Sequence, residues 1–512
     1  MAKIGKNVLE NLTQAMYSDS RIVYREYIQN STDQIDVAKK NNSFPGEELQ
    51  IYITIDPKKR NIYIEDNANG IPQNEVKKRL GDVADSEKIQ GDARGFRGIG
   101  RLGGIGYCKE LRFVTSYRGE DKQTTMIWDA DKLNEIIHDP NNHDSAEKVL
   151  KDIIKYQIDD CEKEKHFFKV EMLGVNEEDE KLLDIDDIEQ YISEVAPVDF
   201  DSSFLFASKI KGFIEDHDEV PPLRTYPIFL RELGGELTEI KKKYPNRIYR
   251  VNNDRKESVD EVTNIQADLI RDESGRAIAW IWYAITGFKG VINEAGNPMR
   301  GLRLRQFNML IGDRETLSPE KKFFKEGRGN HYFLGEVHTL AKELRPNARR
   351  DYFIETPVTR DFENSLQEYV SNNLESLYRD GSKLNSAYNK LKKLQKLEKD
   401  IKERQKKGSA SDVEDKKYAQ QKKEAVEKAK QAVKDIEKIN KKAKENPNSA
   451  IAKVTKYVTK QNEINDIHLE SLKNEVLGTD SNQGKDKPRE DISSSAVNTT
   501  GNDTRNNSSL QL

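Results

Sequence analysis

The sequence predicts an α+β protein with two consecutive α/β domains, a helical, partly coiled-coil region and a disordered tail. Before residue 360, short apolar stretches alternate as in strands or recur at helical spacing. From residue 362 the apolar residues follow a near-heptad pattern, which is typical of long packed helices. The last residues are rich in Ser, Asn, Thr and Gly and cannot form a core. The expected divisions are 1–180, 190–360, 362–476 and 477–512.

The N-terminal region alternates between expected helices and strands. Two helices are predicted within residues 1–40, because apolar residues recur there at helical spacing. A glycine-rich stretch covers residues 91–106, and the charged, weakly patterned residues 130–165 are expected to be a helical insertion. The remaining apolar stretches are expected to be strands: 49–55, 61–65, 111–116 and 167–172.

After residue 190 the sequence predicts strands first and then long helices. The clearest strands of the second domain are expected at 278–286 and 301–311. Beyond residue 362, two helical arms are separated by the Gly/Ser-containing residues 408–411, and residues 446–448 break the second arm. A further helix is expected at 451–476.

The charge is unevenly distributed along the 512 residues, which carry a net charge of −4. From Gly381 to Lys444, 21 Lys/Arg stand against 10 Asp/Glu, or +11, which leaves −15 for the rest. The helical region therefore differs electrostatically from the body of the protein.

The composition argues against a secreted or membrane protein. Cys108 and Cys161 cannot build a disulfide framework and lack metal-ligand spacing. The chain has no apolar run approaching ~18 residues, and residues 1–6 lack the apolar core of a secretion signal. We expect a cytoplasmic protein that does not associate with a membrane.

The first chemically suggestive stretch lies on the second expected helix. Glu26, Asn30 and Asp33 are four and three residues apart, so they share one helical face. An acid and an amide one turn apart suit a water-activating base beside a Mg²⁺ ligand. A solvated polar face is the simpler interpretation of this stretch alone.

Two more stretches could take part in a nucleotide site. Asp66 follows an apolar strand and opens a tight turn through Asn69 and Gly70, where a carboxylate can accept a bond from an adenine amino group. Taken alone, this is also an ordinary turn. The glycines of 95–106 can cradle phosphates with backbone N–H groups, although flexible loops look similar. The loop is not a Walker A motif, since Gly-Lys-Ser/Thr is missing.

The order and spacing of the three stretches resemble the signature boxes of the gyrase, heat-shock chaperone, histidine kinase and MutL (GHKL) superfamily. Residues 24–36 resemble the chaperone version most. The resemblance implies a Bergerat-type α/β sandwich that binds and hydrolyses ATP with Mg²⁺. Glu26 would be the general base and Asn30 the Mg²⁺ ligand, with Asp66 bound to adenine. The other residues placed at the nucleotide by resemblance are Asp33, Asn69, Gly70, Gly95, Gly98, Ile99 and Gly100, the last four in a phosphate lid.

The sequence departs from the superfamily pattern at two places. Ala68 replaces the first glycine of the usual Asp-x-Gly-x-Gly turn. Phe167-Phe168 stands where a Gly-Thr pair normally begins a later strand and supports the adenine-binding Asp. The support of Asp66 must therefore differ here.

The second domain narrows the resemblance to Hsp90-like proteins. The chain has neither the His-Glu motif of sensor kinases nor the Gln-Thr-Lys loop of gyrases. Residues 344–351 are similar to the middle-domain loop with which heat-shock chaperones present an Arg to the γ-phosphate, and Arg350 takes that position. An Arg pair in a surface ion-pair network is the alternative. The arrangement resembles bacterial Hsp90-like ATPases, with MORC-type proteins more distant.

The resemblance implies an ATP-driven conformational clamp, whose purpose stays open. One hypothesis is a chaperone-like remodeller of protein clients; another is a DNA-associated ATPase, comparable to MORC proteins or to a component of bacterial defence. A third is a nucleotide-gated switch without useful hydrolysis. The basic helical region is compatible with a solvated coiled coil, an internal brace, a homodimer contact or an arm that touches DNA. It has few aromatic residues that could stack on bases.

Overall fold

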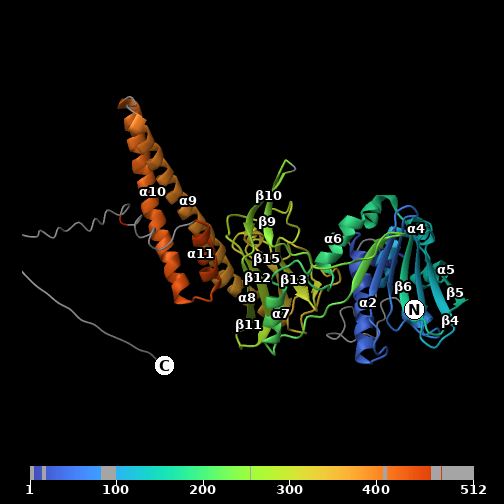
Figure 1. Cartoon of the computed structure of the whole chain (residues 1–512). Helices are drawn as coiled ribbons and strands as arrows, with labels where there is room; N and C mark the ends of the chain where they lie inside the picture. The colour runs from blue at the N-terminus through green and yellow to red at the C-terminus, as the bar shows by residue number, and fades with distance from the viewer. Residues whose placement is uncertain are drawn as a thin grey trace, which may run out of the picture.

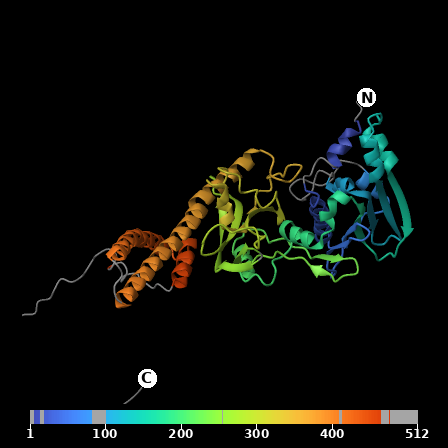
Figure 2. The same ribbon diagram turned by 90° about the horizontal axis from the view of Figure 1, so that it is seen from above.

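The computed structural model describes residues 5–13, 19–81, 100–253, 255–407, 412–462 and 474. The lid residues Gly95, Gly98 and Ile99 and the tail expected at 477–512 lie outside these ranges. Figure 1 shows three parts in a row: an N-terminal sheet with its helices, a second sheet in the centre, and a long helical hairpin at the far end. Figure 2 shows the same order from above. The α+β class, with its C-terminal helical region, is confirmed.

The N-terminal part is built on an eight-stranded sheet with the order β5-β4-β3-β6-β2-β1-β7-β8. All neighbouring strands are antiparallel except β1 and β7, which are parallel. The strands are β1 (Ile51–Asp56), β2 (Asn61–Asp66), β3 (Cys108–Ser116), β4 (Lys122–Asp129), β5 (Ile154–Asp160), β6 (Phe167–Val175), β7 (Ile228–Glu232) and β8 (Thr238–Glu239). Strands β7 and β8 extend this sheet, although the sequence assigns their residues to the second domain. The domain divisions remain a prediction.

Helices pack against this sheet and enclose the N-terminal core. Their bounds are α1 (Asn7–Thr13), α2 (Ile22–Lys40), α3 (Val76–Gly81), η1 (Gly100–Tyr107), α4 (Ala130–His138), α5 (Ala146–Ile153), η2 (Glu177–Leu183) and α6 (Ile185–Val195). Two helices within residues 1–40 were predicted correctly. The helical insertion expected at 130–165 is wrong in its second half, because residues 154–160 form β5 and pair with β4. Most side chains of this edge strand are exposed, so no apolar alternation marked it.

The second part centres on a five-stranded sheet with the order β11-β12-β15-β13-β14. Its elements are α7 (Ala207–Glu215), β9 (Arg247–Asn252), β10 (Arg255–Glu261), β11 (Asn264–Arg271), β12 (Ala277–Ile285), β13 (Gly301–Gln306), β14 (Met309–Leu310), η3 (Gly327–Tyr332), β15 (Leu334–Thr339) and α8 (Pro357–Tyr369). The single strand expected at 301–311 is instead a hairpin of β13 and β14. Phe307 and Asn308 turn it with φ of 50° and 66°.

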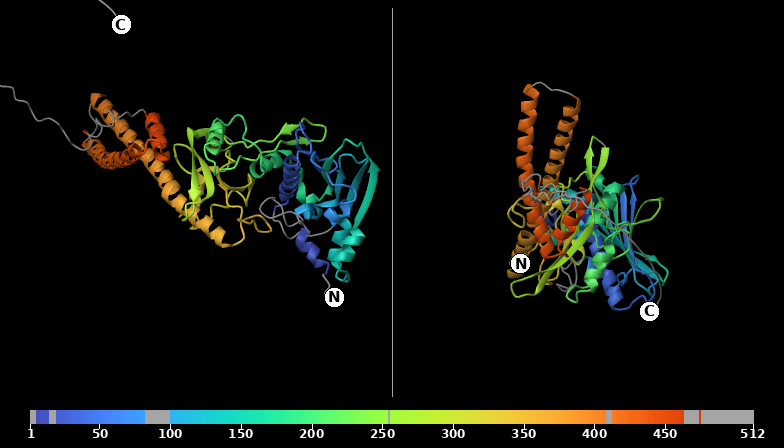
Figure 3. Two further views of the ribbon diagram at one scale, coloured as in Figure 1. Left: turned by 90° about the horizontal axis from the view of Figure 1, so that it is seen from below. Right: turned by 60° about the vertical axis from the view of Figure 1, so that its left-hand side comes forward.

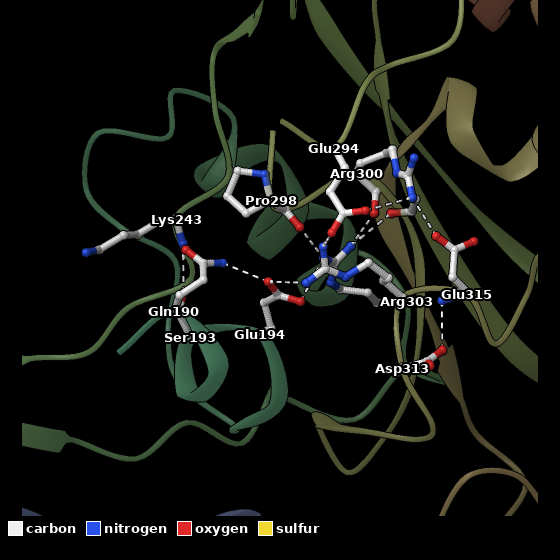
Figure 4. A network of polar contacts seen from close by, with 12 residues as sticks. Gln190, Ser193, Glu194, Lys243, Glu294, Pro298, Arg300, Arg303, Asp313 and Glu315 are labelled. Atoms are coloured by element: carbon white, nitrogen blue, oxygen red, sulfur yellow. Dashed lines mark hydrogen bonds and ion pairs between the residues drawn. The ribbon is translucent and has the colours of Figure 1, made fainter. Parts of the chain in front are cut away.

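Helix α6 joins the two sheets through a buried ionic network (Figure 4). The Glu194 carboxylate lies 3.1 Å from Nη2 of Arg303, whose side chain is fully buried. Arg314 approaches the same carboxylate, and Arg305 donates to the Glu194 carbonyl oxygen at 2.8 Å. Burial makes an unpaired charge costly here, so the network holds α6 firmly on the second sheet.

The C-terminal part is helical; it shares a core with the second sheet and projects from it as a long hairpin (Figure 3, right). It consists of a π-helical turn, η4 (Val370–Leu374), followed by α9 (Glu375–Lys407), α10 (Asp412–Glu445) and α11 (Ala450–Gln461). Among the described helices, none combines the length and apolar character needed to cross a bilayer.

Candidate active site

Helix α2 carries the first stretch of candidate residues. Its apolar side chains recur at helical spacing and are buried in the N-terminal core: Val23, Tyr24, Tyr27, Ile28, Ile35 and Ala38. Glu26 lies between them and is only 5% exposed. Asn30, one turn further along, is half-buried, and Asp33 is buried. The three polar residues thus follow one another on successive turns of one packed helix.

Two guanidinium groups and one glycine surround the Glu26 carboxylate. Its Oε1 lies 3.3 Å from Nε of Arg350 and 3.5 Å from Nη2 of Arg25. A Cβ atom added to Gly100 would meet Oε2 at 2.2 Å, so only glycine allows the backbone to approach this closely. Glu26 is therefore held at the meeting point of α2, the end of the glycine-rich loop and the second part of the protein.

The loop that carries Arg350 is held in an uncommon backbone conformation. Arg350 has a φ of 56°, in the left-handed region that L residues rarely adopt. Its carbonyl oxygen accepts a bond from the Gly312 N–H at 2.7 Å, and its N–H donates to the Asn347 carbonyl oxygen at 3.2 Å. Arg25 donates to the Arg349 carbonyl oxygen at 3.1 Å. These bonds direct the Arg350 side chain toward α2.

Asp66 ends β2 on the buried side of the strand. Side chains alternate along β2, which puts Ile62, Ile64 and Asp66 on the covered face. Oδ1 of Asp66 accepts a bond from the Ala68 N–H at 3.2 Å, whereas the buried Oδ2 has no partner among the described residues. Burial raises the pKa of the carboxyl to about 7, although a bond from Ser31 opposes the shift. An unpartnered buried carboxylate oxygen fits a ligand that brings an N–H donor, such as an adenine amino group.

The turn after Asp66 is supported by neighbouring strands. Gly70 has a φ of 66°, and an added Cβ would lie 2.0 Å from the Ser116 carbonyl oxygen. The Thr115 hydroxyl accepts a bond from the Ile71 N–H at 2.8 Å and donates to the Phe167 carbonyl oxygen at 3.0 Å. Strand β6 begins at Phe167, and Phe168 pairs with Asp66. Thr115 on β3 thus ties the turn to β6 where the superfamily has Gly-Thr. Asn69, also in this turn, is half-buried.

The described end of the glycine-rich loop packs on α2. Tyr27 Oη accepts a bond from the Gly104 N–H at 3.0 Å and donates to the Arg101 carbonyl oxygen at 3.1 Å. An added Cβ at Gly104 would lie 2.3 Å from this hydroxyl. Gly100 is therefore placed at the site, while the lid residues Gly95, Gly98 and Ile99 fall outside the described residues.

The available donors fit Mg²⁺ held mainly by a nucleotide. The described residues contain no group of three or more His, Cys, Asp or Glu that could hold a metal. Mg²⁺ in nucleotide sites usually takes one or two protein oxygens and completes its shell with phosphate and water. The Asn30 amide oxygen is a suitable donor of this kind.

Comparison with known proteins identifies the class of domain. Residues 17–166 match the family model described as "Histidine kinase-, DNA gyrase B-, and HSP90-like ATPase". This match covers α2, β1 to β5 and the connection to β6, so the resemblance to GHKL-type ATPases is confirmed for the N-terminal part.

The curated relatives are bacterial Hsp90-like chaperones. The chain is 27% identical over 154 residues to the chaperone protein HtpG of Rickettsia canadensis, covering 27% of this chain and 24% of that protein. HtpG of Shouchella clausii is 24% identical over 172 residues, covering 30% and 27%. HtpG of Anaplasma marginale is 31% identical over 127 residues, covering 22% and 20%. The chain thus spans about a quarter of the length of the curated relatives it matches.

Sequence reasoning missed three residues of the site: Arg25, Ser31 and Thr115. Arg25 and Ser31 lie within the predicted motif of α2. Only the fold shows that Arg25 contacts Arg349 and that Ser31 contacts Asp66. An Arg inside an apolar helical run is a usable signal, because a buried guanidinium needs partners. Thr115 carries no local signal, since its role depends on which strands become neighbours.

Exchange of Asp66 for Asn is expected to weaken ATP binding about tenfold or more, because Oδ2 would no longer be an acceptor for the ligand.

The Asp66→Asn exchange should also change how the free energy of unfolding depends on pH. The folded carboxyl has a pKa of about 7, whereas the ordinary pKa of an Asp side chain is 3.8, so the folded, nucleotide-free state holds an extra proton between these pH values. The free energy of unfolding should fall by up to about 1.4 kcal/mol per pH unit as pH rises through this window, and level off above it.

Nucleotide titration and urea unfolding at pH 5 to 8 measure both effects. Asp56→Asn is a matched control, since Asp56 is also buried and ends the neighbouring strand β1. The assignment of Asp66 is wrong if Asp66→Asn binds ATP like the wild type and shows the same pH slope as Asp56→Asn.

Proposed function

We propose that this protein is a Mg²⁺-dependent ATPase that works as an Hsp90-like conformational clamp. The observation that supports this most is the contact of Arg350 with Glu26, since it brings residues from the N-terminal part and the second part together at one carboxylate. Two guanidiniums around the Glu26 carboxylate leave one net positive charge in this group of three side chains, which favours a triphosphate.

The chemistry proposed for this site is attack of water on the γ-phosphorus. Glu26 accepts a proton from the water as its oxygen bonds to phosphorus, and the bond to the β-phosphate oxygen breaks to release ADP and phosphate. The Arg350 guanidinium, freed from Glu26 by the incoming phosphate, stabilises charge on the transferring phosphoryl group. When bound through Asn30 and the phosphates, Mg²⁺ would neutralise phosphate charge.

The contacts between the two sheets suggest how hydrolysis drives movement. Besides Arg25 and Arg349, Arg224 forms an ion pair with Asp36 of α2 at 3.0 Å, and the Tyr226 hydroxyl donates to the same carboxylate. Arg224 also accepts a bond from the Asn308 side chain at its carbonyl oxygen, at 2.8 Å, so the segment before β7 ties the nucleotide helix to the β13–β14 turn of the second sheet. Loss of the γ-phosphate removes a partner of Arg350, so docking of the second part depends on nucleotide state.

The partner on which the clamp acts is a protein client or a nucleic acid. A clamp of this kind could serve in bacterial defence or act on DNA as MORC-type proteins do. We propose a cytoplasmic homodimer, because the closing of two protomers on each other would let ATP binding and hydrolysis clamp and release a partner. A nucleotide-gated switch is the second candidate. Ala68 favours it, because this residue stands where the superfamily has glycine and is fully buried beside Asp66.

Steady-state ATP hydrolysis by the purified chain, with Mg²⁺ or with EDTA, tests the proposal. Turnover that EDTA abolishes supports the ATPase. Tight nucleotide binding without turnover, also in the presence of duplex DNA, would favour the switch. Absence of binding would overturn both.

A further inference from the structure

We propose that the hairpin of α9 and α10 is an arm that binds the phosphate backbone of double-stranded DNA without reading its sequence. The arm lies at the opposite end of the molecule from α2 (Figures 1 and 3). The start of α9 packs on the second part, where the Ser382 hydroxyl donates to the Phe288 carbonyl oxygen at 2.9 Å, and the far end of the hairpin projects away from both sheets. Its DNA contact does not depend on the ATP chemistry proposed above, so the two can fail separately.

The lysines of α10 form a row on one side of the helix. The row consists of Lys416, Lys423, Lys430, Lys434, Lys438 and Lys441. At about 100° per residue they fall within roughly 80° of the helix circumference, and they extend over about 38 Å. All are exposed except Lys430, which is half-buried. The row is long enough to lie beside many successive phosphates of a DNA duplex.

The row lies opposite the face that packs on the rest of the arm. The buried face of α10 consists of Ala429, Ala432, Val433, Ile436, Ile439 and Ala443. Because these apolar residues centre about half a turn away from the lysines, the ammonium groups face outward. On α9, the exposed Lys392, Lys393, Lys396, Lys402 and Lys406 add further positive charge.

Two acidic residues of the arm are placed where they hold the helices together, while others, such as Glu427 beside Lys430, stay exposed on the outside. Glu398 of α9 lies 3.2 Å from Lys422 of α10, and Asp435 of α10 lies 3.1 Å from Lys383 of α9. Their side chains are only 16% and 10% exposed. A merely solvated helix pair usually mixes both signs on its outside. Here these two inter-helix acids are partly covered, and lysines outnumber the acids that remain exposed on the outer faces.

The lysines of the row are largely available to a ligand. Lys430 pairs with Glu427 at 2.9 Å. Within the described part of the arm, Lys434, Lys438 and Lys441 form no ion pair with a carboxylate. Binding a polyanion would release counterions from these groups without breaking internal contacts.

Duplex DNA fits the arm better than a single strand does. Single-stranded nucleic acids are bound on aromatic side chains that stack with bases. Between residues 390 and 445 the sequence has one aromatic residue, Tyr418, and the Arg404 guanidinium lies over its ring, 4.8 Å from the centroid. A straight lysine row without stacking residues suits regular backbone phosphates.

Binding of a labelled 30-base-pair duplex, measured by fluorescence anisotropy without nucleotide at several salt concentrations, tests the inference. The variant is Lys423→Gln, Lys434→Gln, Lys438→Gln and Lys441→Gln together. We expect it to bind at least about tenfold more weakly than the wild type, with a salt slope smaller by up to about 3.6, or 0.9 per lost phosphate contact.

A control with the same change in net charge carries Gln at four exposed lysines of the N-terminal part: Lys40, Lys58, Lys59 and Lys155. It should bind like the wild type, and circular dichroism should show that both variants are folded. The inference is overturned if the wild type does not bind, if both variants lose equal affinity, or if a single strand of equal length competes as well as the duplex. It is also overturned if the arm variant loses binding only to vesicles containing anionic lipids.

Discussion

Replacement of Glu26 by Ala is expected to lower ATP turnover about 10²–10⁴-fold while ATP still binds. The carboxylate is the proposed proton acceptor for the attacking water, and general-base catalysis contributes a factor of this size. Removal of this charge also leaves Arg25 and Arg350 with no carboxylate between them. The nucleotide affinity should therefore stay the same or rise. Single-turnover hydrolysis and equilibrium binding of ATP measure the two effects separately.

Two further variants make this result specific. Glu26→Gln keeps the size of the side chain but cannot accept the proton, so it should be as inactive as Glu26→Ala. Glu48→Gln changes an exposed carboxylate just before β1 and should leave turnover unchanged. Loss of ATP binding in both Glu26 variants would mean that Glu26 shapes the pocket and does not act on the water.

The sequence predicted the local features of the site well, because helical and strand periodicity determine where side chains point. Glu26, Asn30 and Asp33 were expected on one helix, and all three lie on α2. Asp66 was expected at the end of a strand and ends β2. By resemblance alone, the loop was expected to present Arg350 to the γ-phosphate, and the Arg350 guanidinium lies 3.3 Å from Glu26. The chemical roles of these residues remain predictions.

The parts that sequence could not predict depend on contacts between distant segments. Strand β5 was missed because it lies at a sheet edge with most side chains exposed, so burial imposed no alternation on it. The turn at Phe307 and Asn308 was missed because its flanking residues are buried on both sides and read as one continuous strand. The joining of β7 to β1 is a pairing across more than a hundred residues, which no local pattern encodes.

Removal of the Arg350 side chain is expected to reduce turnover about 10³-fold, because a guanidinium that contacts a transferring phosphoryl group contributes at least that much. In Arg350→Ala, the Glu26 carboxylate keeps Arg25 as a partner, so α2 should stay intact and ATP binding should change little. Rapid-quench measurement of the hydrolysis step, beside equilibrium binding, separates the loss of chemistry from a loss of affinity.

The backbone conformation at position 350 allows a test that distinguishes a catalytic role of the Arg350 side chain from a structural one. Its φ of 56° is strained for any residue with a Cβ, by roughly 1–2 kcal/mol, and unstrained for glycine. Arg350→Gly should therefore be at least as stable as Arg350→Ala and equally slow. The control is Arg349→Ala, since Arg349 is exposed and contributes its carbonyl oxygen to Arg25, which alanine retains. If Arg349→Ala slows hydrolysis as much as Arg350→Gly does, the loop matters for docking the two parts, and Arg350 is not the group that contacts the phosphate.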